Sequence, residues 1–267
     1  MKIGIILLGR MGSTRLPGKV MLELCGKPVL EHIIDRLSKV NAKPLIVATS
    51  TKKQDDLIIE LCQRKNIAFF RGSENNVLDR CIKAAKAYKL DAFVRLGADN
   101  PFVDWEIINR LLYIFLKEYN NGNHIEYLSN CMQRSFPLGL DVEIMTKDVL
   151  LKVEKKIRPL PDDQRKLNEI NVIPYIHQNC DQFNTFSYHE DFDHSHLRWT
   201  LDTPEDFELI KKVYIELYYK NSEFLMKDIL ALFEKNPELS HINAEVIPKS
   251  GFWTKTEKQK LTKRIKI

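Results

Sequence analysis

Strand-like and helix-like segments alternate four times in the first 119 residues, and this alternation constrains the fold more than any other feature of the chain. Four largely apolar segments have the length and composition of buried strands: residues 2–9, 43–50, 66–72 and 91–99. After each comes a segment with apolar residues at helical spacing: residues 27–40, 54–65, 75–89 and 104–119. This pattern predicts an α/β fold with a mostly parallel mixed sheet and helices on both faces.

The second half of the sequence is less regular. Strand-like segments occur at residues 124–130, 138–145, 182–189 and 196–202. Helix-like segments occur at residues 146–156, 161–179, 203–219 and 223–236, and Thr203 and Pro204 are typical of a helix start. No linker composition occurs before about residue 240. The sequence therefore predicts one domain over residues 1–240 and a basic tail over residues 241–267.

Charge and composition exclude several classes of protein. The net charge is +5, and much of the excess lies in the tail. A basic tail can bind nucleic acid or an anionic membrane, but this one has no aromatic residues beyond Phe252 and Trp253, so a solvated terminus is favoured and no nucleic-acid partner is predicted. No apolar run reaches the roughly 18 residues of a membrane span. We expect a soluble cytoplasmic protein with free thiols at Cys25, Cys62, Cys81, Cys131 and Cys180.

The segment GRMGSTRLPGK, residues 9–19, follows the first predicted strand. Ligands of open α/β sheets bind beyond the carboxyl ends of the strands. Glycines let backbone amides approach an anion, and Arg10, Arg15 and Lys19 supply charge and hydrogen bonds. The spacing of the glycines and the valine after the lysine do not match a Walker P-loop. A polyphosphate is the favoured ligand, and a basic surface loop is the alternative.

Two aspartates follow predicted strands near helix starts. Asp99 lies in the segment RLGADNPFVD, and Asp202 lies in RWTLDTPED. Mg²⁺ is commonly held by one or two carboxylates together with phosphate oxygens. Each aspartate alone also suits a turn or helix cap. Taken together, they predict a pair of Mg²⁺ ligands.

A third segment, SFPLGLDVEIM, is a candidate for binding the acceptor of a transferred group. Its candidate residues are Gly139, Asp141 and Glu143, and the two acids share a face if the segment is a strand. Carboxylates suit a polyol, whereas an acidic acceptor needs a nearby cation such as Arg134 or Arg198. A loop followed by an edge strand is the alternative interpretation.

Two other polar segments are interpreted as structural. Asp55 and Asp56 lie at a predicted helix start, where acids interact favourably with the helix dipole. The histidines of HEDFDHSH match no common zinc spacing, which favours a polar loop at His189, His194 and His196.

Seven segments in order resemble the cytidylyltransferase family: RMGSTRLPGK, ELCGKPVLEHIIDRL, VATS, FRGSENNVLDR, GADNP, FPLGLDVE and LRWTLDTPEDFELI. The family includes the 3-deoxy-manno-octulosonate and acylneuraminate enzymes, and the likeness is greatest to its spore-coat polysaccharide biosynthesis protein F branch. It covers residues 1 to about 220. The resemblance implies a Rossmann-like nucleotide-diphospho-sugar transferase fold. It also implies transfer of CMP from CTP to a sugar or sugar acid, with release of pyrophosphate, for surface polysaccharide synthesis.

The resemblance also implies roles for residues. Residues 1–119 become a nucleotide-binding half and residues 120–240 an acceptor half. The nucleotide-binding candidates are Leu8, Gly9, Arg10, Gly12, Ser13, Arg15, Lys19 and Arg71. The catalytic candidates are Lys19, Arg15 and Asp99, and Asp99 and Asp202 match the carboxylates that bind Mg²⁺. The chain departs from its relatives at Leu8 and Gly9, where they usually carry Gln-Ala or Pro-Ala, and at Asn171, where they carry His.

Other functions stay open on the sequence alone. A glycosyltransferase of the same broad fold would use a nucleotide-sugar donor, although no Asp-x-Asp motif ends the fourth predicted strand. A nucleotide-binding protein without turnover would bind CTP but release no pyrophosphate. The sequence leaves the oligomeric state open, a homodimer included.

Overall fold

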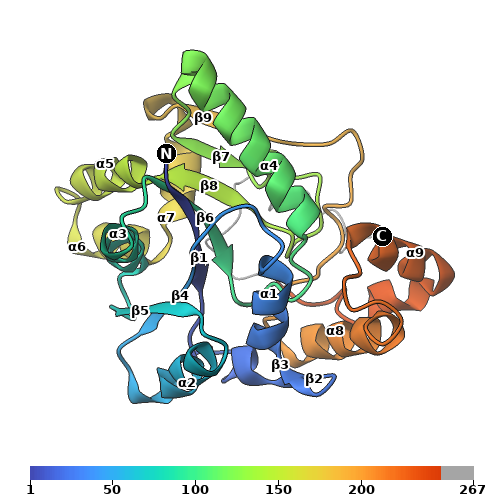
Figure 1. The fold of residues 1–267 in the computed structure, drawn as a ribbon. Helices are drawn as coiled ribbons and strands as arrows, with labels where there is room; N and C mark the ends of the chain where they lie inside the picture. Colours follow the sequence, from blue (N-terminus) through green and yellow to red (C-terminus); the bar gives the residue numbers. More distant parts are fainter. Residues whose placement is uncertain (248–267) are drawn as a thin grey trace.

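The computed structural model describes residues 1–247 of the 267, and a seven-stranded mixed sheet forms the centre of this part of the chain (Figure 1). The strand order is β5-β4-β1-β6-β8-β7-β9, and all neighbours are parallel except the two pairs that include β8. The strands are β1 (Ile3–Leu8), β4 (Leu45–Ser50), β5 (Ala68–Gly72), β6 (Ala92–Gly97), β7 (Tyr127–Ser129), β8 (Glu143–Thr146) and β9 (Thr185–Ser187). A separate hairpin consists of β2 (Glu23–Leu24) and β3 (Lys27–Pro28). The predicted mostly parallel mixed sheet is confirmed.

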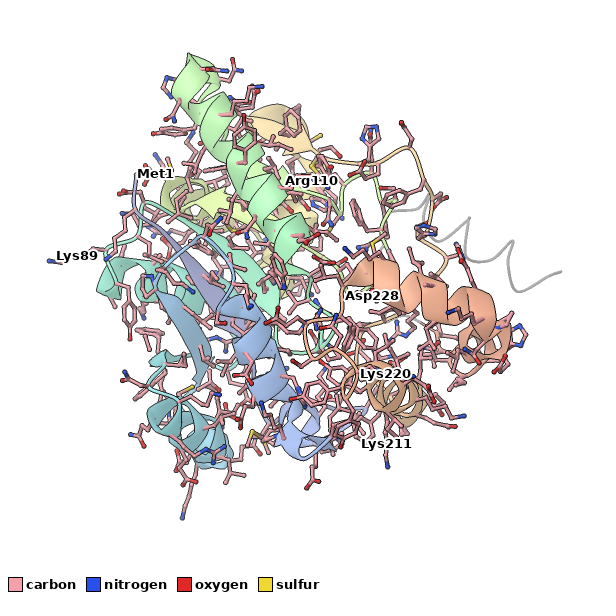
Figure 2. All side chains as sticks on the ribbon, turned by 45° about the vertical axis from the view of Figure 1, so that its right-hand side comes forward. Met1, Lys89, Arg110, Lys211, Lys220 and Asp228 are labelled. Carbon is pink, nitrogen blue, oxygen red and sulfur yellow. The ribbon has the colours of Figure 1, made fainter. Side chains whose placement is uncertain are left out.

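Helices cover both faces of the sheet, as predicted (Figure 1). One apolar core includes residues of α1 (Val29–Leu37), α2 (Asp56–Arg64), α4 (Trp105–Glu118), α8 (Pro204–Leu217) and α9 (Met226–Lys235). The other includes residues of α3 (Val77–Ala87), α5 (Lys147–Ile157) and α7 (Val172–Gln178), and α6 (Asp162–Ile170) packs beside it. Successive strand residues alternate between the two cores. In β1, Ile5 and Leu7 face the first core and Ile6 faces the second. Apolar side chains fill both layers, whereas Lys89, Lys211 and Lys220 lie at the periphery (Figure 2).

Short helical turns connect several of these elements. They are η1 (Lys19–Met21), η2 (Lys53–Asp55), the π-helical turn η3 (Tyr119–Asn123), η4 (Cys180–Gln182) and η5 (Pro237–His241). None of the helices in residues 1–247 combines the length and apolar character needed to cross a bilayer. The five cysteines are free thiols, as predicted.

The strand order reverses between β1 and β6. From β1 the chain proceeds outward to β4 and β5, and α3 then returns it to β6 on the other side of β1. The loops after β1 and β6 therefore diverge at one point on the carboxyl edge of the sheet. Such a reversal is where open α/β sheets bind their ligands. The predicted phosphate loop and Asp99 both lie at this point.

Two predicted strands of the second half differ in the structure. Residues 196–202 were expected to form a strand but contribute only an isolated bridge between Leu138 and Arg198. The alternating apolar pattern of this segment has another cause. The segment is extended, its backbone forms hydrogen bonds with loops, and Leu197, Trp199 and Leu201 are buried in the core. The strand predicted over 138–145 begins only at Glu143.

The helix predicted over 161–179 is divided. It separates into α6 and α7 at Asn171, whose φ of −116° and ψ of 72° are not helical. Most of the predicted basic tail, residues 248–267, lies outside the described residues. The division into a nucleotide-binding half and an acceptor half stays a prediction.

Candidate active site

Three oxygen atoms surround the ammonium group of Lys19 at the carboxyl edge of the sheet. The Nζ atom lies 2.8 Å from Oδ2 of Asp99, 2.9 Å from Oδ1 of Asp202 and 2.7 Å from the backbone oxygen of Leu201. Lys19 begins η1, and Gly18 before it has a φ of +69°, a conformation that favours glycine. The structure thus brings Lys19, Asp99 and Asp202 together.

Backbone contacts hold the turn after β6 against the segment before α8. The Leu201 amide donates to the backbone oxygen of Asp99 at 2.7 Å, and the Thr200 hydroxyl donates to the same oxygen at 3.3 Å. A Cβ atom on Gly97 would overlap Oδ1 of Asp99, so glycine at this position leaves room for the Asp99 carboxylate where it stands. These contacts position Asp99 beside Asp202 although about 100 residues separate them.

Positive charge surrounds the Asp202 carboxylate. Besides Lys19, it meets Nη2 of Arg15 at 2.8 Å and Nη2 of Arg198 at 3.2 Å. Burial on its own would raise the pKa of Asp202, but Lys19, Arg15 and Arg198 outweigh burial and hold that pKa below its ordinary value. Burial would likewise lower the pKa of Lys19, but Asp99 and Asp202 raise it. Lys19 and Asp202 are therefore both ionised at neutral pH.

Asp206 positions the turn that carries Asp202. This carboxylate is fully buried and accepts two hydrogen bonds from Arg198, both at 2.8 Å. It also accepts from the backbone amides of Asp202 and Thr203 at 2.9 and 3.0 Å, and Thr203 caps α8 in return. The predicted cap at Thr203 is confirmed, and Asp202 itself is not the capping residue.

Asp55 anchors the loop after β1. Its carboxylate is fully buried and accepts hydrogen bonds from the Met11 amide at 2.8 Å and the Thr49 hydroxyl at 2.8 Å. It also accepts from the amide and hydroxyl of Ser50 at 3.0 and 2.5 Å. Asp55 directly precedes α2, as predicted, but its carboxylate makes no capping bond to that helix and instead joins β4 to the loop.

Two predicted nucleotide-binding arginines, Arg71 and Arg10, already contact other groups of the protein. Arg71 donates to the backbone oxygens of Ser50 and Lys52 at 3.0 and 2.8 Å and pairs with Asp56 at 2.7 Å. These bonds fix the loop after β4 to β5. Arg10 is more exposed and lies 3.6 Å from the Glu74 carboxylate. A nucleotide role for both arginines stays a prediction.

The remaining nucleotide-binding candidates lie along the same loop. Leu8 ends β1, and a Cβ atom on Gly9 would lie 2.9 Å from the Cβ atom of Ala98, so β1 and β6 approach closely here. A Cβ atom on Gly12 would lie 2.9 Å from Oε1 of Glu74. The Ser13 hydroxyl accepts from the Leu16 amide at 3.4 Å within the loop.

The acceptor candidates lie in two ion pairs and one tight backbone contact. Glu143 is buried and pairs with Arg95 at 2.5 Å, and Asp141 pairs with Arg134 at 2.5 Å. Asp141 precedes β8, so the shared strand face expected for the two acids is not formed. Gly139 has a φ of +115°, and a Cβ atom there would lie 2.6 Å from the backbone carbon of Trp199. Acceptor binding by these residues stays a prediction.

Several positioning groups were not identified from the sequence. Arg95 and the Leu201 carbonyl contact partners far along the chain, and no local pattern marks them. Asp206 has a local signal, because it lies three residues after Thr203, the spacing of a capping box. Asp55 has one local signal, because Thr49 and Ser50 supply hydroxyl donors six and five residues before it. The segment of the three predicted loop histidines has no helix or strand, as expected.

The oxygen atoms around Lys19 suit a hard divalent cation. Two carboxylates and a backbone carbonyl are ligands that Mg²⁺ accepts, and phosphate oxygens and water usually supply the rest. In residues 1–247 no group of three or more His, Cys, Asp or Glu side chains could hold a metal by itself. The donor set fits Mg²⁺ together with a bound phosphate. Metal binding by Asp99 and Asp202 stays a prediction.

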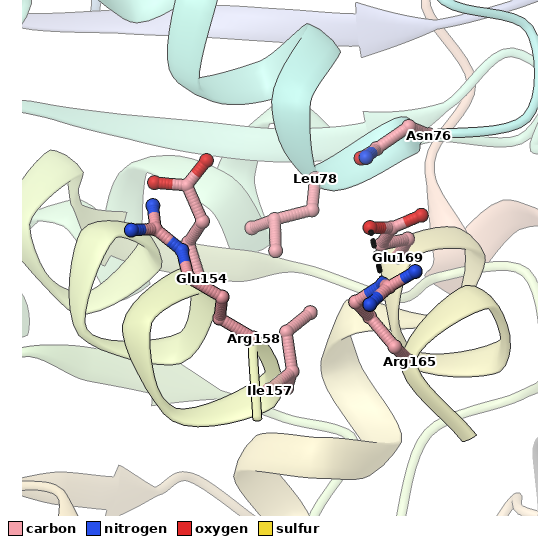
Figure 3. A pocket seen from close by; sticks show the side chains of 7 residues that line it. All are labelled: Asn76, Leu78, Glu154, Ile157, Arg158, Arg165 and Glu169. Atoms are coloured by element: carbon pink, nitrogen blue, oxygen red, sulfur yellow. Dashed lines mark ion pairs between the residues drawn. The ribbon is translucent and has the colours of Figure 1, made fainter. Parts of the chain in front are cut away.

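A separate cavity of about 250 Å³ lies among α3, α5 and α6 (Figure 3). Its lining residues are Asn76, Leu78, Glu154, Ile157, Arg158, Arg165 and Glu169. Arg165 and Glu169 form an ion pair at 3.8 Å. None of the predicted site residues lines this cavity, so the site at the carboxyl edge is the stronger candidate.

The family model for cytidylyltransferases matches residues 4–235. The chain is 31% identical to the spore coat polysaccharide biosynthesis protein SpsF of Bacillus subtilis, over 87% of this chain and 94% of the relative. It is 30% identical to a 3-deoxy-manno-octulosonate cytidylyltransferase of Trichlorobacter lovleyi, over 43% and 46%. A cytidylyltransferase structure from Leptospira borgpetersenii is similar, with 35% identity, a TM-score of 0.83, and coverage of 93% of this chain and 100% of that one. The chain belongs to the cytidylyltransferase family.

Proposed function

We propose that this protein transfers CMP from CTP to a sugar acid or sugar and releases pyrophosphate, in the synthesis of a surface polysaccharide. The observation that carries the proposal is the convergence of Lys19, Arg15 and the carboxylates of Asp99 and Asp202 where the strand order reverses. Anions and their metal ions bind at such an edge. Membership of the cytidylyltransferase family supports CTP as the donor.

The chain's own residues would bind and orient the triphosphate. Backbone amides around Gly12 and the side chains of Arg15 and Lys19 would hold the β- and γ-phosphates. Asp99, Asp202 and the Leu201 carbonyl would hold Mg²⁺, which supplies charge stabilisation at the transferring phosphorus when it is bound. The acceptor oxygen attacks in line, and no covalent enzyme intermediate is needed because catalysis consists mainly of positioning and charge stabilisation.

The acceptor would lie on the side of β8. Arg134 next to Asp141 places a guanidinium beside a carboxylate, which suits an acceptor that carries both a carboxylate and hydroxyls. The relative from Trichlorobacter lovleyi is named for a sugar acid, and the relative from Bacillus subtilis is named for polysaccharide synthesis. We propose that the reaction takes place in the cytoplasm.

A screen of pyrophosphate release tests this function. The four nucleoside triphosphates are each combined with a panel of sugars and sugar acids, with Mg²⁺ present. We expect release with CTP and at least one sugar acid or sugar, and loss of release after EDTA treatment. Consumption of a nucleotide sugar without pyrophosphate release would identify a glycosyltransferase instead, and CTP binding without turnover would identify a binding protein.

The Asp202→Asn variant tests the assignment of the metal-binding carboxylates. Asparagine keeps the size of the side chain but removes the charge, so turnover should fall by at least about tenfold. The matched control is Asp35→Asn, since Asp35 also pairs with two lysines, Lys27 at 2.8 Å and Lys65 at 2.7 Å, but lies away from the site. Full turnover of Asp202→Asn would contradict the assignment.

A further inference from the structure

All three donors of the Lys19 ammonium group are used within the protein. A lysine ammonium has three N–H donors. Those of Lys19 have three partners within 2.9 Å, namely the carboxylates of Asp99 and Asp202 and the carbonyl of Leu201. The side chain is also buried. In this arrangement Lys19 has no donor left for a phosphate, although its place at the end of the predicted phosphate loop suits phosphate binding.

The same three oxygens form the set that fits Mg²⁺. Magnesium binds its oxygen ligands at about 2.0–2.1 Å, so an ion on these atoms would overlap the space of the ammonium group. Lys19 and a divalent cation therefore compete for one position. Arg15 and Arg198 contact the other oxygen of Asp202, Oδ2, and can stay in place when Oδ1 changes its partner.

We propose that Lys19 and the divalent cation exchange places during nucleotide binding. In the metal-free protein Lys19 neutralises the two carboxylates, whose mutual repulsion would otherwise destabilise the site. Arrival of the metal with CTP displaces the ammonium group, which then donates to the triphosphate, and the Leu201 carbonyl becomes a third protein ligand of the metal. This inference rests on the proposed function and adds an ordered change of partners to it.

Binding of Mn²⁺ to the Lys19→Met variant tests the exchange. Methionine keeps the length of the side chain and removes the ammonium group. Without nucleotide, the variant should bind Mn²⁺ at least about tenfold more tightly than the wild type, measured by electron paramagnetic resonance, because no competitor must first leave. With Mn²⁺ saturating, its affinity for CTP should fall by at least about tenfold in calorimetry, because the phosphate contact is lost.

The matched control is Lys27→Met. Lys27 lies 2.8 Å from Asp35 in a comparable ion pair outside the site, so this variant should change neither affinity. Unchanged Mn²⁺ affinity in Lys19→Met, together with loss of Mn²⁺ binding in Asp202→Asn, would overturn the exchange and leave the metal site standing. Wild-type Mn²⁺ affinity in Asp202→Asn would overturn the metal site as well.

A second measurement uses the wild-type protein and does not depend on the folding of Lys19→Met. Nitrogen-15 NMR of the lysine side chains should show a shift of the Lys19 signal when Mg²⁺ and CTP are added together. The signal is assigned by its absence from Lys19→Arg. A Lys19 signal that stays unchanged at saturation would overturn the exchange.

Discussion

A single buried carboxylate, that of Asp55, anchors the predicted phosphate loop of residues 9–19. It accepts four hydrogen bonds, one of them from the Met11 amide in the loop. Burial on its own would raise the pKa of Asp55, but the bonds from Ser50, Met11 and Thr49 outweigh burial and lower it. The ionised carboxylate therefore links the carboxyl ends of β1 and β4. Asp55 contacts none of the predicted metal ligands and acts on the site through the loop.

The Asp55→Asn variant tests this positioning role. An amide cannot accept from all four donors, so the free energy of unfolding should fall by about 2–3 kcal/mol. KM for CTP should rise, whereas KM for the acceptor should stay the same. The neighbouring variant Asp56→Asn is the control, because Asp56 is half exposed and loses one surface ion pair worth about 1 kcal/mol or less. A rise in both KM values would indicate a general loss of structure instead.

At the scale of elements, the segment 137–140 is a support for the segment 197–202. The Leu138 amide donates to the backbone oxygen of Leu197 at 2.9 Å, and the Trp199 amide donates back to Leu138 at 2.7 Å. Gly139 directly follows Leu138 and lies against the backbone of Trp199 and Thr200. The supported segment continues directly into Asp202, so the fit at Gly139 controls the position of a candidate metal ligand.

The Gly139→Ala variant should therefore affect both stability and activity. A Cβ atom would meet backbone atoms at 2.6–2.8 Å, and backbone cannot rotate away as a side chain can. We expect a loss of about 3 kcal/mol or more in the free energy of unfolding, from overpacking together with the cost of a positive φ. Gly26→Ala is the control, because Gly26 has a φ of +81° with no atom within 4 Å of the added Cβ, so it measures conformational strain alone. Equal losses in the two variants would contradict the steric argument.

The elements that could be predicted from the sequence are those with a local pattern. The strand and helix periods of the first 119 residues gave the βα order, and the loop of residues 9–19 was placed at the correct edge. The strand predicted at 196–202 is wrong because the alternating burial of this segment comes from its packing against the core and not from pairing in a sheet. The pairing of Lys19 with Asp202 spans 183 residues and depends on how Asp206 and Arg198 fix the start of α8. Such long-range contacts leave no periodic pattern in the sequence. The sequence could therefore identify Lys19 and Asp202 as candidates but could not predict that they contact each other.

At the scale of the whole molecule, the pH dependence of stability has two separate causes. His177 of α7 lies 2.9 Å from the Tyr127 hydroxyl and near Arg134 and Asp141. Burial, assisted by Arg134 and opposed by Asp141, lowers the pKa of His177 to about 4. The carboxylates of Asp55 and Asp202 have lowered pKa values too, and their stabilisation is lost only below about pH 4. Histidine and carboxylate effects therefore fall in different pH ranges.

Between about pH 6.5 and pH 4 the unfolded chain protonates His177 whereas the folded protein does not. The free energy of unfolding should therefore fall as pH decreases through this range, and each pKa unit corresponds to about 1.4 kcal/mol. The shift from 6.5 to about 4 makes the contribution of His177 about 2–3 kcal/mol at pH 4. His32, whose pKa burial also lowers, makes the free energy of unfolding fall further over the same pH range.

Urea unfolding of His177→Gln at several pH values tests this. The free energy of unfolding of the variant should depend less steeply on pH than that of the wild type between pH 6.5 and pH 4, and both proteins should lose the same stability below pH 4. The exposed His124→Gln is the matched control and should keep the wild-type slope. A wild-type slope in His177→Gln would mean that the imidazole is charged in the folded protein, and the buried contact with Tyr127 would have to be described again with a protonated ring.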